Sequence, residues 1–304
     1  MPGFEHLPGF VLVPMPASAY NGGCRVLRGS RRGEMPNVHV RGTRVFYAVS
    51  RGEGPAVVLI HGAGGSRLHW PASLRRLSDA CVYALDLPGH GRSGGRGRER
   101  IEDYAGDVVG FLDAVGVERA VLVGHSMGGG VAQAVALTAP GRVSALVLLS
   151  TGARLRVAPA VLEGLGRDFA GTIRQVAEWA WGPGADPALV AEGRRLMEEA
   201  GPRVLLGDFL ACDRFDVRDR VGKIPAPTLV VTGSEDQMTP PRFGRWLADR
   251  IPDARFSLVE GAGHMLALER PAEVAAMVEG WLSAVHQGTS RKASSRPKPA
   301  GGSR

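Results

Sequence analysis

The order of apolar and polar positions along the chain alternates between two patterns. Short runs such as Ala56–Ile60 and Val143–Ser150 are apolar at nearly every position, as in strands buried on both faces of a sheet. Longer segments between them repeat apolar residues with the period of an amphipathic helix. Strands are expected at residues 38–41, 45–50, 56–60, 81–85, 120–123, 143–150, 228–232 and 255–259, and helices near 67–77, 101–115, 131–137, 241–250 and 271–285. This alternation predicts an α/β fold with a doubly wound, mostly parallel eight-stranded sheet.

The alternation stops between about residues 152 and 222. This stretch has no run typical of a strand, and its period predicts helices at 161–176 and 187–200, with a shorter one near 202–211. We therefore expect a helical cap, residues 152–222, inserted into a core made of residues 36–151 and 223–286. The end segments 1–35 and 287–304 are rich in glycine, proline and basic residues and are expected to be disordered.

The net charge of +7 lies at the two ends of the chain. Residues 1–35 contribute +2 and residues 287–304 contribute +5, so the segment between them is neutral. An electrostatic surface for DNA or RNA needs basic residues gathered on the folded domain. The charge distribution therefore argues against a nucleic-acid partner and leaves a small-molecule substrate as the expected partner.

The cysteines and the apolar runs bear on the setting of the protein. Three cysteines, Cys24, Cys81 and Cys212, are too few and too scattered for a disulfide framework or a metal site, so a reducing, cytoplasmic location is expected. No apolar run in the sequence is long enough to cross a bilayer, and no signal peptide is expected, because prolines interrupt the apolar N-terminal stretch. No cofactor or metal is predicted, and the oligomeric state is not readable from the sequence.

The most informative motif is the G-x-S-x-G sequence of residues 124–128, with Ser126 at its centre. It stands between the apolar run 120–123 and the helical run 131–137, which is the strand–turn–helix context of a nucleophile elbow. Glycine is favoured at both flanking positions, because a side chain there would collide where the strand and the helix approach each other. Ser126 is therefore the candidate nucleophile.

A second G-x-S-x-G sequence occupies residues 91–95 and carries Ser93. It follows a Pro-Gly turn and leads into the basic run 96–100, with no strand directly before it and no helix directly after it. A five-residue G-x-S-x-G sequence recurs by chance in a glycine-rich chain, so the strand before it and the helix after it are needed to identify an elbow. We therefore interpret Ser93 as a loop residue.

A serine nucleophile needs a base to take its proton and an acid to orient that base. In this architecture the acid and the base follow later strands, in the chain order Ser, acid, His. Asp236 follows the strand 228–232 and is the candidate acid, although the adjacent Glu235 has nearly the same spacing. His264 lies in a glycine-containing loop after the strand 255–259 and is the candidate base. Hydrogen-bonding roles within loops are expected for His61, His90 and His125.

Cleavage of an ester also needs N–H donors for the negative charge that develops on the carbonyl oxygen. The backbone amide of Met127, at the start of the elbow helix, is one candidate for this oxyanion hole. The second is expected in the loop after the strand 56–60, where small residues let a backbone N–H face the substrate. We choose Ala63, and Gly62 and Gly64 remain open as alternatives.

Taken together and in their order along the chain, these motifs resemble those of α/β-hydrolases of the esterase, lipase and lactonase type. The resemblance covers about residues 36–286 and rests on His61–Gly65, Asp86–Ser93, Gly124–Gly129, Gly233 with Asp236 and Pro240, and Gly263 with His264. It implies the α/β-hydrolase fold with an inserted cap, and a structural loop near the site at residues 86–93. The serine at position 126 speaks against haloalkane dehalogenases and epoxide hydrolases, which resemble this pattern but use an aspartate there.

The predicted activity is that of a serine hydrolase acting on a small to medium, largely apolar carboxylic ester. Two alternatives stay open: a lactonase or C–C bond hydrolase using the same three residues, and a non-catalytic ligand-binding protein with this fold. One of the cap arginines can bind a substrate carboxylate, but the sequence does not say which. Candidates for the wall of a substrate pocket are the aromatic residues Trp70, Phe169, Trp179, Trp181 and Phe209.

Overall fold

The computed structural model describes residues 36–294, and the expectations for residues 1–35 and 295–304 lie outside the described residues. The described strands are β1 Asn37–Val40, β2 Thr43–Ser50, β3 Ala56–Ile60, β4 Cys81–Leu85, β5 Ala120–His125, β6 Val143–Leu149, β7 Thr228–Gly233 and β8 Ala254–Val259. The described helices are η2 Arg67–His69, α1 Ala72–Arg75, α2 Ile101–Val115, α3 Met127–Thr138, η3 Pro140–Arg142, α4 Pro159–Arg167, α5 Phe169–Ala180, α6 Pro187–Arg214, η4 Val221–Lys223, α7 Pro241–Ala248, α8 Leu266–Glu269 and α9 Pro271–Ser294.

The strands form one sheet in the order β1-β2-β4-β3-β5-β6-β7-β8. Strand β2 pairs antiparallel with β1 and with β4, and the pairs from β4 through β8 are parallel. The predicted doubly wound, mostly parallel eight-stranded sheet is therefore confirmed. Because parallel strands end at the same edge, the loops that follow β3, β5, β7 and β8 meet at the carboxyl edge of the sheet.

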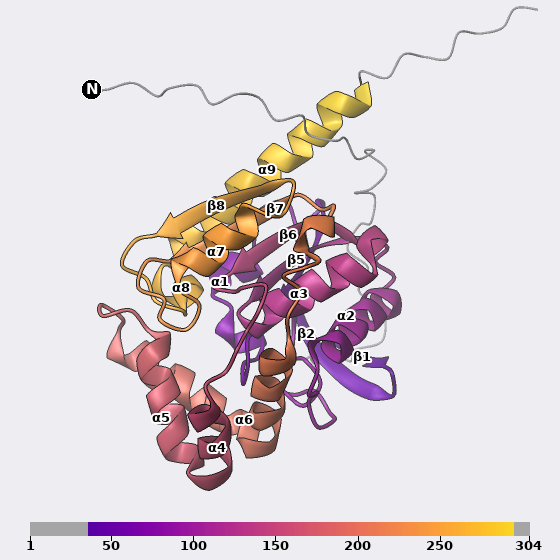
Figure 1. Cartoon of the computed structure of the whole chain (residues 1–304). Helices are drawn as coiled ribbons and strands as arrows, with labels where there is room; N and C mark the ends of the chain where they lie inside the picture. Colours follow the sequence, from indigo (N-terminus) through magenta and orange to yellow (C-terminus); the bar gives the residue numbers. More distant parts are fainter. Residues whose placement is uncertain (1–35, 295–304) are drawn as a thin grey trace, which may run out of the picture.

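Both faces of the sheet are covered by helices, which explains the continuous apolar runs. In β3, Val58 and Ile60 join the core beneath α2, α3 and α7, whereas Val57 and Leu59 join the core beneath α1, α8 and α9. Successive side chains of a strand point to opposite faces, so a strand covered on both sides must be apolar throughout. Burying each such side chain stabilises the fold by about 1.5–3 kcal/mol. Figure 1 shows α2 and α3 side by side along the strands.

Three predicted helices differ from the structure. The segment predicted as one helix at 67–77 is divided into η2 and α1, because Pro71 lacks the N–H that would continue a helix. The segment predicted at 161–176 is divided into α4 and α5, since the Asp168 side chain accepts from the Gly171 amide and starts a new helix. Helix α9 runs to Ser294, so residues 287–294, predicted to be disordered, are helical. The first proline after Pro271 is Pro297, so no proline interrupts α9.

The segment between β6 and β7 holds α4, α5 and α6, which lie together at one end of the sheet (Figure 1). Helix α6 is kinked at Gly201, followed by Pro202, which matches the predicted pair of helices at 187–200 and 202–211. The three helices enclose a small core of their own, which includes Val161, Ile173 and Leu205. An isolated antiparallel bridge between residues 154 and 216 joins the two chain segments that enter and leave this group of helices.

Candidate active site

Ser126 sits in a strained turn between β5 and α3. Its backbone has φ 53° and ψ −117°, and residues other than glycine rarely adopt a positive φ. A Cβ atom at Gly124 would overlap the carbonyl oxygen of Gly128, and one at Gly128 would overlap the carbonyl oxygen of Ile60. All these obstacles are backbone atoms that cannot swing aside. The turn therefore requires both glycines, and the predicted elbow geometry is confirmed.

Asp236 and His264 are brought together from the loops that follow β7 and β8. The Nδ1 atom of His264 lies 3.0 Å from Oδ2 and 3.1 Å from Oδ1 of Asp236. The carboxylate also accepts from the amides of Met238 and Thr239 and from the Thr239 hydroxyl, at 2.8–3.0 Å. Asp236 and His264 are each 3% exposed. The neighbouring Glu235 is exposed, and its carboxylate accepts from the Ser234 hydroxyl instead.

The pKa of Asp236 is shifted by two opposing effects. Burial of the carboxyl group acts to raise its pKa, but the charge of His264, the hydrogen bond to it and the bonds from Thr239 outweigh burial and lower the pKa below 3.8. Asp236 is therefore an anion at neutral pH. Its charge orients the imidazole, with the Nδ1–H as donor, and stabilises that ring when the other nitrogen takes up a proton.

His125 holds the loop that carries His264. Its Nε2 atom donates to the carbonyl oxygen of His264 at 2.9 Å, and the two rings lie 4.9 Å apart. Burial, together with the nearby His264, lowers the pKa of His125 to about 3. His125 is thus a neutral hydrogen-bond donor at neutral pH, in agreement with the role predicted for it.

The loop after β3 leaves two candidate oxyanion donors. The Gly64 amide donates to Oδ2 of Asp208 at 2.8 Å, and the Gly65 amide donates to the carbonyl oxygen of Gly62 at 3.0 Å. In the described part of the chain, no hydrogen-bond acceptor is assigned to the amides of Ala63 and Gly62. Gly64 is thereby removed from the alternatives that the sequence left open, whereas Ala63 and Gly62 remain. The Met127 amide is the first of α3, where helical geometry provides no acceptor.

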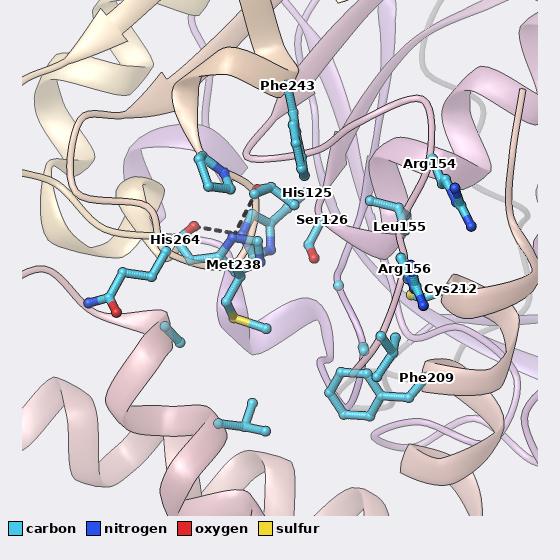
Figure 2. A pocket seen from close by; sticks show the side chains of 18 of the residues that line it. His125, Ser126, Arg154, Leu155, Arg156, Phe209, Cys212, Met238, Phe243 and His264 are labelled. Carbon is cyan, nitrogen blue, oxygen red and sulfur yellow. Dashed lines mark hydrogen bonds between the residues drawn. The ribbon is translucent and has the colours of Figure 1, made fainter. Parts of the chain in front are cut away.

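A cavity of about 640 Å³ opens at this edge of the sheet. Ala63, Ser126 and His264 all line it, and so do side chains from the α4–α6 segment. In the view of Figure 2, Ser126 lies between His264 on one side and the chain segment of Leu155 and Arg156 on the other. The volume is that of a site for a small organic molecule.

Comparison with known proteins agrees with this architecture. Residues 57–277 match the alpha/beta hydrolase family. The chain belongs to that family. It is 30% identical to a putative carbamate hydrolase, RutD, of Azorhizobium caulinodans over 275 residues, which are 83% of this chain and 100% of the relative. It is also 30% identical to a 2-hydroxymuconate semialdehyde hydrolase of Pseudomonas putida over 270 residues, 77% of this chain and 89% of the relative. The solved structure of a thermophilic esterase superposes with a TM-score of 0.74 at 33% identity, covering 83% of this chain and 98% of that one.

In this alpha/beta hydrolase, one of the five predicted pocket aromatics lines the cavity, namely Phe209. Trp70 is 2% exposed in the core under α1 and α9, where it borders a void of about 10 Å³. Phe169 and Trp179 pack against the core of the α4–α6 segment, and Trp181 packs against Gly193 and Gly263. The prediction therefore differs from the structure for these four side chains. Large rings bury most area where helices pack together, and that is where they lie.

The second G-x-S-x-G sequence is a loop, as predicted. The Ser93 hydroxyl donates to the carbonyl oxygen of Asp86 at 2.6 Å and accepts from the Phe46 amide at 2.8 Å. The buried Asp86 carboxylate in turn accepts from the amides of Arg67 and Arg92. This loop is also tied to the loop after β3, residues 61–65, which holds the candidate oxyanion donors and is called the oxyanion loop below. The Leu87 amide donates to the ring of His61 at 3.1 Å.

Asp208 of α6 is a buried carboxylate that the sequence analysis missed. It is fully buried and accepts from the Gly64 amide at 2.8 Å, from His90 Nε2 at 2.7 Å and from the Tyr104 hydroxyl at 2.6 Å. Burial acts to lower the pKa of His90, but the charge of Asp208, the hydrogen bond to it, the bond to the Pro88 carbonyl and the charge of Asp86 raise it overall. Asp208 thus fastens the α4–α6 segment to the oxyanion loop. An acidic residue among Leu205, Phe209 and Cys212 was the available sequence signal.

We expect Asp208→Asn to destabilise the protein by about 2–4 kcal/mol, because an amide cannot satisfy three donors as a carboxylate does and leaves His90 without its counter-charge. The kcat value should fall about tenfold to a hundredfold, since displacement of the oxyanion loop misplaces Ala63. Thermal unfolding and steady-state kinetics measure the two effects. Asp168→Asn is the matched control, because Asp168 is an exposed helix cap and asparagine caps equally well.

The pH dependence gives this prediction a second readout. The pKa of His90 is raised above 6.5, so the ion pair adds stability that is fully present below 6.5 and is lost as pH rises through the raised pKa. The Tm of the wild type should therefore fall as the pH increases above 6.5, and that fall should be smaller in Asp208→Asn. Equal slopes in the two proteins would contradict the assigned ion pair.

Between Pro36 and Ser294, no group of three or more His, Cys, Asp or Glu side chains is arranged to hold a metal ion. None of the helices in that range is both long enough and apolar enough to cross a membrane.

Proposed function

We propose that the protein is a serine hydrolase that cleaves a small to medium, largely apolar carboxylic ester through an acyl-enzyme intermediate. The observation that supports this most is that the buried Asp236–His264 pair and the strained Ser126 meet at one cavity, which both His264 and Ser126 line. A hydrogen-bonded acid–imidazole pair that faces the same cavity as a partly buried serine is the arrangement expected where a base makes a hydroxyl nucleophilic. Esterases are also among the solved relatives of this alpha/beta hydrolase.

In the proposed reaction, the Ser126 oxygen attacks the ester carbonyl carbon while its proton passes to Nε2 of His264. The amides of Met127 and Ala63 donate hydrogen bonds to the oxygen that becomes negative. The protonated imidazole, stabilised by Asp236, gives its proton to the leaving alkoxide as the C–O bond breaks. Water then repeats the sequence with His264 as base, and this releases the carboxylic acid and restores the serine.

The cavity supports a substrate of moderate size with a mainly apolar body. Its volume of about 640 Å³ lies in the range of small-molecule sites, and Val176, Met197, Phe209 and Met238 contribute apolar wall. A lactone is a cyclic ester and passes through the same steps. A C–C bond hydrolase shares the same three residues, and one relative at 30% identity is the semialdehyde hydrolase named above. A panel of acyl esters of increasing chain length, lactones and a vinylogous diketone separates these substrate classes by kcat/KM.

A fluorophosphonate probe tests whether the serine is activated. We expect stoichiometric labelling on the peptide that contains Ser126, because only a hydroxyl with an adjacent base attacks the phosphorus rapidly. Mass spectrometry of the digested protein locates the label, and Ser93, in the second G-x-S-x-G sequence, serves as the internal control. Labelling at another residue would refute Ser126 as the nucleophile, and no labelling at all would favour a ligand-binding protein over an enzyme.

A further inference from the structure

The wall of the cavity carries an excess of positive charge. Four arginines line it, Arg154, Arg156, Arg218 and Arg242, and among the described residues that line it there is no aspartate or glutamate. All four arginines are exposed, so they stand at the mouth of the cavity, where water keeps their charges solvated in the free protein. Burial lowers the pKa values of the lining histidines His69 and His125 to about 4 and about 3, so neither adds charge at neutral pH.

Two of the four guanidinium groups are already used within the protein. Arg218 Nη2 lies 2.7 Å from Oδ2 of Asp216, and Arg154 Nε lies 3.7 Å from the same carboxylate oxygen. The Arg154 contact joins the two segments that enter and leave the α4–α6 group, and the Arg218 contact lies within the segment that leaves it. The ion pairs with Asp216 therefore account for the presence of Arg154 and Arg218 at the cavity.

No ion pair of this kind accounts for the other two arginines, Arg156 and Arg242, in the described part of the chain. Within residues 36–294, no carboxylate is paired with Arg156 or Arg242. The Arg242 guanidinium carbon lies 5.0 Å from the centre of the Phe243 ring, so Arg242 stacks beside another residue of the cavity wall. Figure 2 shows Arg156 on the side of Ser126 opposite His264, next to Cys212. Two unpaired cations thus border the space that a substrate held at Ser126 would occupy.

The charged and apolar parts of the wall come from different elements. The arginines belong to the segment before α4, to the segment after α6 and to the first turn of α7. The apolar side chains Val176, Ala180, Met197 and Phe209 belong to α5 and α6. A cavity built this way fits a molecule with an apolar body and one anionic end. A wholly apolar ester would make no use of the two arginine charges, which would stay solvated by water.

We propose that the substrate carries, in addition to the bond that is cleaved, an anionic group, a carboxylate or a phosphate, which Arg156 and Arg242 bind at the mouth of the cavity. This inference rests on the proposed function and specifies its substrate class. Guanidinium groups bind carboxylate and phosphate through charge-assisted hydrogen bonds, which are the stronger kind. Arg156 and Arg242 are specificity-determining residues in this assignment, and the chemistry stays with Ser126.

The test compares two p-nitrophenyl esters that share the same adipoyl chain. One is the mono-p-nitrophenyl ester of adipic acid, an anion at neutral pH, and the other is the p-nitrophenyl ester of monomethyl adipate, which is neutral. We expect the wild type to prefer the anion in kcat/KM by about tenfold or more at low salt, and the double variant Arg156→Ala/Arg242→Ala to bring that ratio to about one. Arg174→Ala is the matched control, because Arg174 is an exposed arginine of α5 that does not line the cavity.

Salt gives an independent readout of the same contact. The Debye length shrinks from about 30 Å at 0.01 M to about 3 Å at 1 M salt. The preference for the anionic ester should therefore fall with salt in the wild type and in Arg174→Ala, and stay flat in the double variant. A wild-type ratio near one at low salt, or a ratio that the double variant leaves unchanged, would overturn the proposal while leaving the esterase assignment in place.

Binding without turnover separates this inference from the proposed function. The wild type is titrated calorimetrically with adipate and, separately, with inorganic phosphate. We expect saturable binding of at least one of these two anions. This binding should be lost in the double variant and kept in Arg174→Ala. The anion that binds identifies the group as carboxylate or phosphate. If no ester is hydrolysed, this titration still tests the arginine site. If neither anion binds the wild type, the site is refuted whatever the activity.

Discussion

Replacing Ser126 by alanine is expected to lower kcat on p-nitrophenyl esters by at least about a thousandfold, because no other group at the elbow can form the acyl-enzyme. The fold should survive this change. Ser126 already has φ 53°, and alanine at the same backbone angle adds no bulk and little new strain. Steady-state kinetics measure the loss, and unchanged thermal unfolding shows that it is chemical. A variant that keeps the wild-type rate would refute the assignment of the nucleophile.

The chain provides its own matched control for this experiment. Ser93 stands at the centre of the second G-x-S-x-G sequence, and its hydroxyl makes hydrogen bonds with Asp86 and Phe46 only as part of a loop. Ser93→Ala should therefore cost about 1–3 kcal/mol of stability, since the partly buried Phe46 amide loses its acceptor. The value of kcat should change by no more than a few fold. A large loss of kcat at position 126 and none at position 93 would show that the strand and helix around the G-x-S-x-G sequence, and not the sequence itself, determine which serine is catalytic.

The sheet and the elbow were predictable because local pattern determines them. A strand covered on both faces must be apolar at every position, and β3 and β4 match the predicted bounds for that reason. The glycines around Ser126 report a backbone approach that no other residue permits. The chain order Ser, acid, His follows from where the strands end, so distant loops could be assigned to one edge of the sheet.

Residue choices that depend on side-chain direction were not predictable. Glu235 and Asp236 are adjacent in sequence, and only the turn that buries one and exposes the other distinguishes them. The oxyanion loop offered three amides, and Gly64 is removed only because Asp208 reaches it from a helix far along the chain. Trp70 lies close in sequence to that loop, yet its ring turns into the core under the sheet. Packing between distant segments decides each case.

Asp236→Asn is expected to lower kcat by about a thousandfold to ten-thousandfold, with a much smaller effect on KM. An amide carries no charge to stabilise the imidazolium, and its NH₂ group favours the wrong tautomer of His264 by donating to Nδ1. The shape of the side chain and its acceptor for the Thr239 amide can be retained. Glu235→Gln makes the same chemical change one residue away on an exposed side chain, and kcat should stay within about twofold. Steady-state kinetics on one ester compare the two variants.

Unfolding in acid distinguishes the charge of Asp236 from its shape. The pKa of this carboxyl group lies below 3.8 in the folded protein, so its ionised form adds stability that is present above 3.8 and is lost as pH falls through the lowered pKa. Asparagine has no proton to gain, so Asp236→Asn should lose less stability than the wild type over that acidic range, although it is the less stable protein at neutral pH. Parallel acid-unfolding curves for wild type and variant, or a large loss of kcat in Glu235→Gln, would remove Asp236 from its proposed role. The His264 imidazole would then need another partner. Among residues 36–294, the structure otherwise assigns only the Thr239 hydroxyl, which carries no charge, within hydrogen-bonding distance of its Nδ1.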